Sequence, residues 1–169
     1  MDFECSQSGA VYRATPAEGY ELEVVLKYDN AVLGDMQAEW TFGDGFGEQI
    51  APARTFSLFS GISGMLQSGL IQGGNFKNAV VIQDDDIPAD QIKSKINKYI
   101  SGGSDVSVKN QVINGPLFFP NEPARHKILD MLGDLSLLNL RIRGRVSAIR
   151  PGHTGNYNFA RYLINAFYG

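Results

Sequence analysis

Residues 121–134, NEPARHKILDMLGD, are the segment from which the rest of this chain can be interpreted. They predict a helix that begins after Asn121 as its N-cap. His126, Asp130 and Asp134 would lie one above another, because helical residues four apart share a face. Apolar residues at spacings of three and four predict a core-facing stripe on the opposite side, made of Ile128, Met131, Leu132, Leu135 and Leu138.

The two histidines of the chain are candidate metal ligands. His126 and Asp130 could form half of a metal site, although a surface ion pair explains this pair better when it is taken alone. His153 follows a Pro-Gly turn, where a side chain can project into a cleft; a solvated residue at a helix N-terminus is the simpler hypothesis. A catalytic zinc takes three protein ligands. The chain could offer these three residues, or it could lack the third ligand.

Composition excludes several classes of protein. The chain has 169 residues, 43% of them hydrophobic and 20% charged, as in an ordinary soluble protein. A net charge of −3 argues against a nucleic-acid binder. The single Cys5 excludes an internal disulfide and a multi-cysteine zinc site, and it fits a reducing compartment. No signal peptide or membrane-length apolar run is present, so we expect a cytoplasmic protein with no integral membrane segment.

The rest of the chain alternates strands and helices. Strands are expected at residues 20–28, 36–42, 53–58, 79–82, 106–113 and 141–150, the first two pairing antiparallel. Helices are expected at residues 58–68, 88–100 and 153–168, with a short helical turn before Pro52. We therefore expect a single α+β domain over residues 1–169, a two-layer sandwich of a mostly antiparallel sheet with helices packed on one face.

Two further segments have unusual residues. In residues 54–56, RTF, the Thr55 hydroxyl could stabilise a developing oxyanion beside a metal. In residues 73–76, GGNF, Gly74 and its neighbour allow a ligand to approach the backbone closely. An exposed strand residue and an ordinary turn explain these segments equally well.

Four motifs in one order closely resemble the zinc-dependent UDP-3-O-acyl-N-acetylglucosamine deacetylases of lipid A biosynthesis. They are residues 54–56 (RTF), 69–81 (GLIQGGNFKNAVV), 125–135 (RHKILDMLGDL) and 151–153 (PGH). The segment around His126 is most similar to the Bacteroidetes-type variant, which is often fused to a 3-hydroxyacyl dehydratase that is absent here. The resemblance runs from about residue 20 to the C-terminus.

The resemblance implies an enzyme of two α+β domains, of which this chain would be the second. His126 and Asp130 would be two of three ligands for Zn²⁺. The third histidine and the general-base glutamate belong to the first domain, and the residues before Tyr20 include no histidine. Residues 56–74 would form the insert that makes a hydrophobic passage for the acyl chain. We therefore expect weak zinc affinity and no activity from this chain alone.

The same resemblance assigns roles to individual side chains. His153 would stabilise the oxyanion and protonate the leaving amine, Asp134 would orient His153, and Thr55 would donate to the tetrahedral intermediate. Lys127 would supply positive charge to the substrate's diphosphate. The other residues that would bind substrate are Phe56 at the nucleotide-sugar, Gly74, and Arg150 at the diphosphate, where the family usually has lysine.

Three functions are compatible with this sequence. The first is the zinc- and substrate-binding half of the deacetylase, acting on UDP-3-O-acyl-N-acetylglucosamine together with a first domain. The second is a non-catalytic module that keeps the groove for acyl chains or nucleotide sugars. The third is a half-enzyme that assembles with a separately encoded first domain. None of the three involves nucleic acid.

Overall fold

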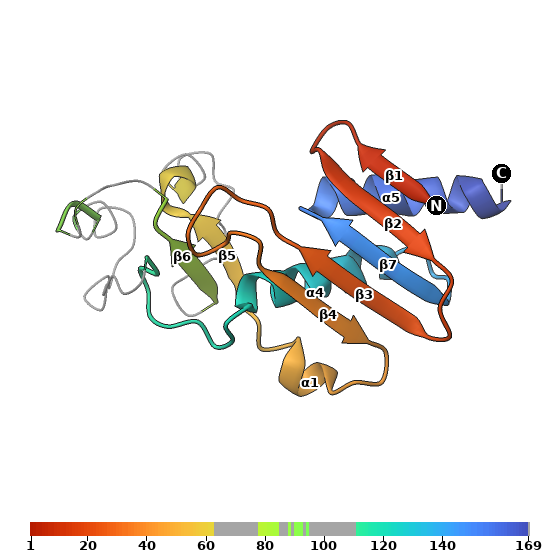
Figure 1. Ribbon diagram of the computed structural model, residues 1–169, viewed down its shortest axis with the longest axis horizontal. Helices are drawn as coiled ribbons and strands as arrows, with labels where there is room; N and C mark the ends of the chain where they lie inside the picture. The colour runs from red at the N-terminus through yellow and green to blue at the C-terminus, as the bar shows by residue number, and fades with distance from the viewer. Residues whose placement is uncertain (63–77, 85–87, 89, 93, 95–110, 169) are drawn as a thin grey trace. The chain divides into compact units, whose positions relative to one another are not determined.

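The computed structural model describes residues 1–62, 78–84, 88, 90–92, 94 and 111–168 (Figure 1). The chain divides into two units, and each is described by itself. Unit 1 consists of Met1–Asp29, Leu33–Ala53 and Asn121–Gly169. Unit 2 consists of Asn30–Val32 and Arg54–Pro120.

Unit 1 contains a five-stranded sheet in the order β1-β2-β7-β3-β4. Only β3 and β7 run parallel; the other three neighbouring pairs are antiparallel, which confirms the predicted mostly antiparallel sheet. The pairing of the first two predicted strands, now β3 and β4, is antiparallel as expected. The strands are β1 Asp2–Cys5, β2 Ala10–Thr15, β3 Tyr20–Val25, β4 Gln37–Thr41 and β7 Gly144–Ile149.

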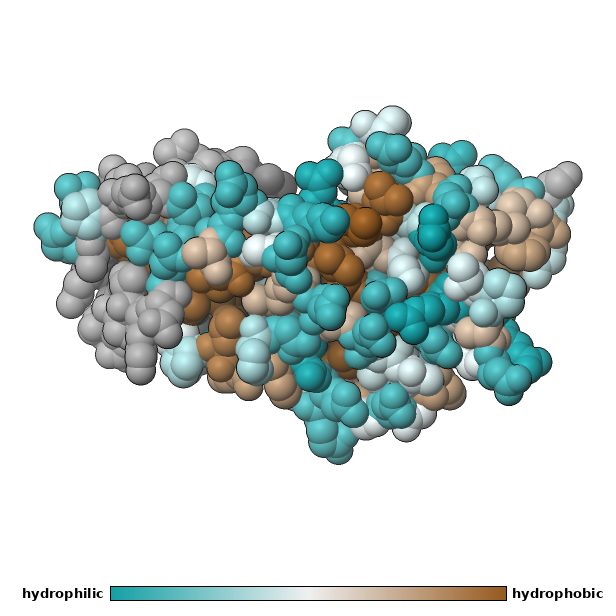
Figure 2. Space-filling model, in the orientation of Figure 1, coloured by the Kyte–Doolittle hydropathy of each residue, from teal (hydrophilic) through white to brown (hydrophobic). Residues whose placement is uncertain are grey.

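Strand residues alternate between a buried face and an open face, because successive side chains of a strand point to opposite sides. The buried face includes Tyr12, Leu22, Val24, Trp40, Val146 and Ala148. The open face is polar around Arg145, whose guanidinium lies 3.4 Å from Glu21, 3.1 Å from Glu23 and 3.2 Å from Glu39. Figure 2 shows this face, where hydrophilic surface covers much of β3 and β7.

Two long helices, α4 Glu122–Ser136 and α5 His153–Tyr168, cover the other face of the sheet (Figure 1). Helix α4 packs against β3, β4 and α5, and α5 packs against β1. Ile128, Met131 and Leu135 of the predicted stripe are buried. The other two members, Leu132 and Leu138, are only half-buried, and Leu138 lies beyond Ser136, where α4 ends.

The predicted helices around the site are found with small changes. Helix α5 has the predicted bounds. Asn121 stands at the N-cap of α4, but its side chain does not cap the helix. Its Nδ2 donates to the Gln37 carbonyl at 2.9 Å, and its Oδ1 accepts from Arg125 at 2.7 Å. The helical turn expected before Pro52 is α1, Phe46–Gln49.

The three predicted strands of unit 1 are shorter in the structure, and the one expected at residues 36–42 spans Gln37–Thr41. The strand expected at residues 20–28 ends at Val25, and the one expected at residues 141–150 begins at Gly144. No helix in the described part of the chain combines the length and the apolar character needed to cross a membrane.

Unit 2 contains a parallel pair of strands, β5 Thr55–Leu58 and β6 Ala79–Ile82. Both were predicted, β6 with the same bounds. Asn114, near the start of the described segment 111–168, is hydrogen-bonded to β6, because its Oδ1 accepts from the Val81 amide at 2.8 Å. Within the predicted helices, residues 59–62, 90–92 and 94 are helical, whereas Leu58 is the last residue of β5 and Pro88 is not helical. The rest of those helices, most of the strand expected at residues 106–113, and Gly74 lie outside the described residues.

Candidate functional site: a histidine and aspartate face on helix α4

The polar face of α4 carries a linked set of charged side chains. His126 Nε2 lies 3.3 Å from Asp130 Oδ1, and Lys127 Nζ lies 2.8 Å from Asp130 Oδ2. The His126 and Asp130 side chains are 16% and 11% exposed. The pair is therefore not the solvated surface ion pair that was the simpler hypothesis. One helical turn brings the imidazole and the carboxylate together, as their spacing predicted.

The other ring nitrogen of His126 determines what this pair can bind. His126 Nδ1 lies 2.8 Å from the carbonyl oxygen of Ala53. A carbonyl only accepts hydrogen bonds, so Nδ1 carries a proton and Nε2 of the neutral ring carries a lone pair. That lone pair faces the acceptor Asp130 Oδ1. Two acceptors at this distance repel each other unless a proton or a cation lies between them.

The electrostatic environment keeps Asp130 ionised. Partial burial would raise its pKa, but the hydrogen bond that His126 Nε2 donates when the ring carries both protons, together with the ammonium of Lys127, outweighs burial and holds the pKa of this carboxyl well below its ordinary value. An ionised carboxylate beside an imidazole lone pair is a donor set that suits a zinc ion. A backbone carbonyl on the outer nitrogen is also the usual way in which a metal-binding histidine is oriented.

The described residues supply two such ligands rather than three. No group of three or more His, Cys, Asp or Glu side chains in the described part of the chain could hold a metal ion. His153, considered above as a third ligand, does not complete a set. Its Nδ1 instead lies 2.9 Å from Asp134 Oδ2. The structure thus fits half of a zinc site.

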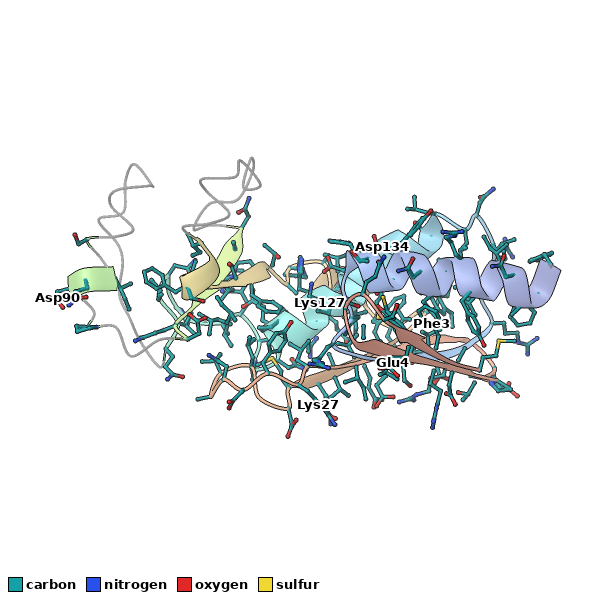
Figure 3. All side chains as sticks on the ribbon, turned by 90° about the horizontal axis from the view of Figure 1, so that it is seen from above. Phe3, Glu4, Lys27, Asp90, Lys127 and Asp134 are labelled. Carbon is teal, nitrogen blue, oxygen red and sulfur yellow. The ribbon has the colours of Figure 1, made fainter. Side chains whose placement is uncertain are left out.

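His153, the first residue of α5, and Asp134, near the end of α4, form a second pair. Figure 3 labels Asp134. The His153 side chain is 73% exposed, whereas that of Asp134 is 22% exposed. The packing of α4 on α5 brings the two residues together, although they are far apart in the sequence. The hydrogen bond expected between them is present. An exposed imidazole with a half-buried carboxylate behind it can accept and give a proton.

Two residues of this site, Asn156 and Tyr12, were not predicted from the sequence. Asn156 Nδ2 donates to Asp134 Oδ2 at 2.7 Å, and Tyr12 donates its hydroxyl proton to Asn156 Oδ1 at 2.7 Å. Asn156 could have been found from the sequence, since it lies three residues after His153 and shares that face of the helix. Tyr12 could not be connected to the site, because it lies on β2 and approaches Asn156 only in the folded chain.

The remaining predicted site residues lie in several places. Arg150 adopts a left-handed backbone conformation with φ 52°, and its guanidinium lies 3.4 Å from the Gly9 carbonyl. Thr55, which is exposed, and Phe56, which is half-buried, lie on β5 in unit 2. The roles assigned to these residues and to Gly74 stay predictions, as does the acyl-chain passage at residues 56–74.

A family model matches almost the whole chain. Residues 1–97 and 92–165 match the model described as LpxC, UDP-3-O-acyl N-acetylglycosamine deacetylase. The match begins at residue 1, whereas the resemblance was expected to begin near Tyr20. The residues before Tyr20 include β1 and β2, which belong to the same sheet as the later strands.

Curated relatives agree with the family match. The chain is 33% identical over 163 residues to a protein of Bacteroides thetaiotaomicron named bifunctional enzyme LpxC/FabZ, covering 96% of this chain and 35% of that protein. It is 34% identical to a protein of the same name from Chlorobaculum tepidum, covering 96% of this chain and 36% of that protein. A UDP-3-O-acyl-N-acetylglucosamine deacetylase of Chlamydia trachomatis serovar L2 is 30% identical, with 92% of this chain and 47% of that protein covered. The chain therefore spans between a third and a half of the length of these relatives.

Proposed function

The chain belongs to the UDP-3-O-acyl N-acetylglycosamine deacetylase family, and from that premise we propose that it supplies half of a zinc-dependent amidohydrolase of lipid A biosynthesis. The reaction would be hydrolysis of the acetamide of UDP-3-O-acyl-N-acetylglucosamine with release of acetate. The share of each relative that the chain covers supports the assignment of one half. The observation that carries the proposal is the convergence of His126 Nε2 and Asp130 Oδ1, with Nδ1 of the same ring held by a carbonyl.

Zinc would be held by His126 and Asp130 of this chain, with its remaining protein ligand supplied by another domain. The chemistry that zinc supplies when bound is polarisation of the amide carbonyl and acidification of a water molecule. Lys127 contacts the second oxygen of Asp130, so it both holds the ligand carboxylate and adds positive charge beside it. A general base is also required, and we assign it to the other domain, as the family resemblance implies.

His153 would handle the proton on the leaving-group side. Its Nδ1 is bonded to Asp134, which leaves Nε2 as the atom that receives and donates a proton. In its imidazolium form, with Nδ1 donating to Asp134, His153 would stabilise negative charge on the substrate and then protonate the departing amine. Thr55 would donate a hydrogen bond to the same oxygen.

The substrate would be recognised by its charged and apolar parts separately. Lys127 and Arg150 would attract the diphosphate, and Phe56 would contact the nucleotide-sugar, with Gly74 allowing close approach. Residues 56–74 would enclose the acyl chain. We place the reaction in the cytoplasm, with a first deacetylase domain, fused or separate, as the partner.

Metal analysis of the assembled protein tests this proposal. The chain would be co-expressed with the first domain of a family member, purified as a complex and dialysed against a mild chelator. We expect about one zinc per complex and substoichiometric zinc in the chain alone, because affinity rises with the number of ligands. His126→Ala and Asp130→Ala should each remove zinc from the complex.

The same samples distinguish the proposed function from a binding module. A non-catalytic module would bind the nucleotide-sugar equally well with His126→Ala and Asp130→Ala and would gain no zinc from the partner domain. A full equivalent of zinc in the chain alone after dialysis would contradict the half-site.

A further inference from the structure

A series of three hydrogen bonds leads from the buried Tyr12 on the sheet to the exposed imidazole of His153. The Tyr12 hydroxyl lies 2.7 Å from Asn156 Oδ1, Asn156 Nδ2 lies 2.7 Å from Asp134 Oδ2, and that oxygen lies 2.9 Å from His153 Nδ1. Tyr12 is fully buried, and Asn156 is 1% exposed. These groups come from β2, α5 and α4, so the three hydrogen bonds connect three elements of unit 1.

The direction of each of these three hydrogen bonds follows from the one group that can only accept, the Asp134 carboxylate. The ionised Asp134 carboxylate only accepts, so the amide NH₂ of Asn156 and a protonated Nδ1 of His153 must face it. The carbonyl of Asn156 then faces Tyr12, which must donate. Burial raises the pKa of the Tyr12 hydroxyl, so this donor keeps its proton. A carboxylate held by two donors on one oxygen has little freedom to turn.

We propose that Tyr12, Gly155 and Asn156 are positioning residues that hold Asp134 so that His153 keeps its proton on Nδ1 and presents Nε2 outward. The inference rests on the proposed function for its catalytic consequence, but not for its structural part. His153 itself is 73% exposed, so few contacts of its own fix its ring. The tautomer and orientation of His153 therefore depend on Asp134. The orientation of Asp134 depends in turn on the buried amide of Asn156.

Gly155 makes this arrangement possible because it lies where the Tyr12 hydroxyl must fit. A Cβ atom at this position would lie 2.5 Å from the hydroxyl oxygen and 3.2 Å from both the Tyr12 ring and Ala10 Cβ. The ring cannot move aside freely, because it stacks on Phe159 with centroids 4.8 Å apart and planes 12° apart. Glycine at residue 155 lets the first turn of α5 approach β2 closely enough for the Tyr12–Asn156 bond.

Nitrogen NMR of the full chain tests the inference without metal or substrate. The chain has two histidines, so a His126→Gln variant assigns the His153 ring signals. In the native sequence, the neutral His153 ring should be mostly the Nδ1–H tautomer. Tyr12→Phe and Asn156→Leu should lower the ratio of Nδ1–H to Nε2–H, by about tenfold for Asn156→Leu, which removes a bond to a charged acceptor.

Tyr162→Phe is the matched control. Tyr162 lies in the same aromatic cluster, with its ring centroid 6.4 Å from that of Phe159, but it makes none of the bonds to Asp134 or Asn156. It should leave the tautomer ratio unchanged. An unchanged ratio in Tyr12→Phe and Asn156→Leu, both folded, would overturn the inference.

Kinetics of the two-domain protein separate this inference from the proposed function. With both correct, Asn156→Leu should lower kcat about tenfold with little change in KM, and Tyr12→Phe should lower it less. A changed tautomer ratio in a complex that hydrolyses no acetamide would keep the positioning role and overturn the function. An unchanged tautomer ratio in a complex that does hydrolyse the acetamide would overturn the positioning role and keep the proposed function.

Discussion

His126 is the residue whose chemistry most constrains the account. Its Nδ1 is fixed on the Ala53 carbonyl, and its Nε2 faces a carboxylate of lowered pKa. The spacing of four residues was enough to predict that His126 and Asp130 meet. The tautomer was not predictable from the sequence, because the carbonyl that sets it lies 73 residues earlier in the chain. Without that carbonyl, an ion pair and a metal ligand pair are indistinguishable.

Zinc titration of the chain tests the two ligand residues directly. Isothermal titration should show weak binding that His126→Gln and Asp130→Asn each weaken by about tenfold or more, since each removes one of two ligands. His153→Gln is the matched control, because its ring is bonded to Asp134 rather than to the ligand pair. Binding that depends on His153 as strongly as on His126 would show that the ligand set is wrong.

Glu23 makes a separate prediction about pH at the open face of the sheet. The hydrogen bond from Ser147, at 2.7 Å, and the Arg145 guanidinium outweigh burial and lower the pKa of Glu23. A carboxyl whose pKa is lowered by folding stabilises the fold above its unfolded pKa of about 4.3 and loses this contribution as pH falls through the folded value. Ser147→Ala should therefore cost about 1 kcal/mol at pH 7 and progressively less in acid.

Denaturant unfolding between pH 7 and pH 3 measures this difference. Ser136→Ala serves as control, because the Ser136 hydroxyl donates to the backbone carbonyl of Gly133 rather than to a carboxylate. Its effect should be nearly independent of pH. A Ser147→Ala effect that stays constant into acid would contradict the pH dependence derived for Glu23.

At the scale of elements, α4 and α5 were the most predictable parts of the site. Helix α5 has the predicted bounds, and α4 begins after the expected Asn121. The contact between them was not predictable from periodicity, although family resemblance implied the bond between Asp134 and His153. Nothing in the first turn of α5 indicated that Gly155 lies against a tyrosine of β2, since that contact exists only in the assembled layers.

Gly155→Ala tests the contact between α5 and β2. The added Cβ would overlap the Tyr12 hydroxyl, so we expect a loss of about 1–3 kcal/mol in the free energy of unfolding, as for overpacking of a core. Gly133→Ala is the matched control on α4, because a Cβ there meets nothing within 4 Å. That change should stabilise by up to about 1 kcal/mol through helix propensity. Equal effects of the two substitutions would contradict the close contact.

At the scale of the whole chain, the largest difference from the sequence-based expectation lies in the first fifteen residues, where no strand was predicted and the structure has two. Strands β1 and β2 form one edge of the sheet, and β2 supplies Tyr12 to the site. A hairpin signal was present, because a short loop ending in Gly9, with φ 65°, joins the two strands. The pairing of β2 with β7 was beyond local signals, because the paired residues lie more than 100 positions apart, as Val11 and Ile149 do.

The family assignment was available from the order of four motifs, and the match from residue 1 extended it. The proposed half of a zinc site is consistent with a chain that spans between a third and a half of the length of its relatives. The central claim is therefore that His126 and Asp130 act only together with another domain.

Acetate release from UDP-3-O-acyl-N-acetylglucosamine, measured with the chain alone and with a first domain added, tests that claim most directly. The account predicts no turnover by the chain alone, turnover on addition of the first domain, and a loss of about a thousandfold with His126→Ala, as expected when several kcal/mol of metal-ion catalysis are removed. Robust turnover by the chain alone with zinc, or a two-domain activity that His126→Ala leaves unchanged, would contradict it.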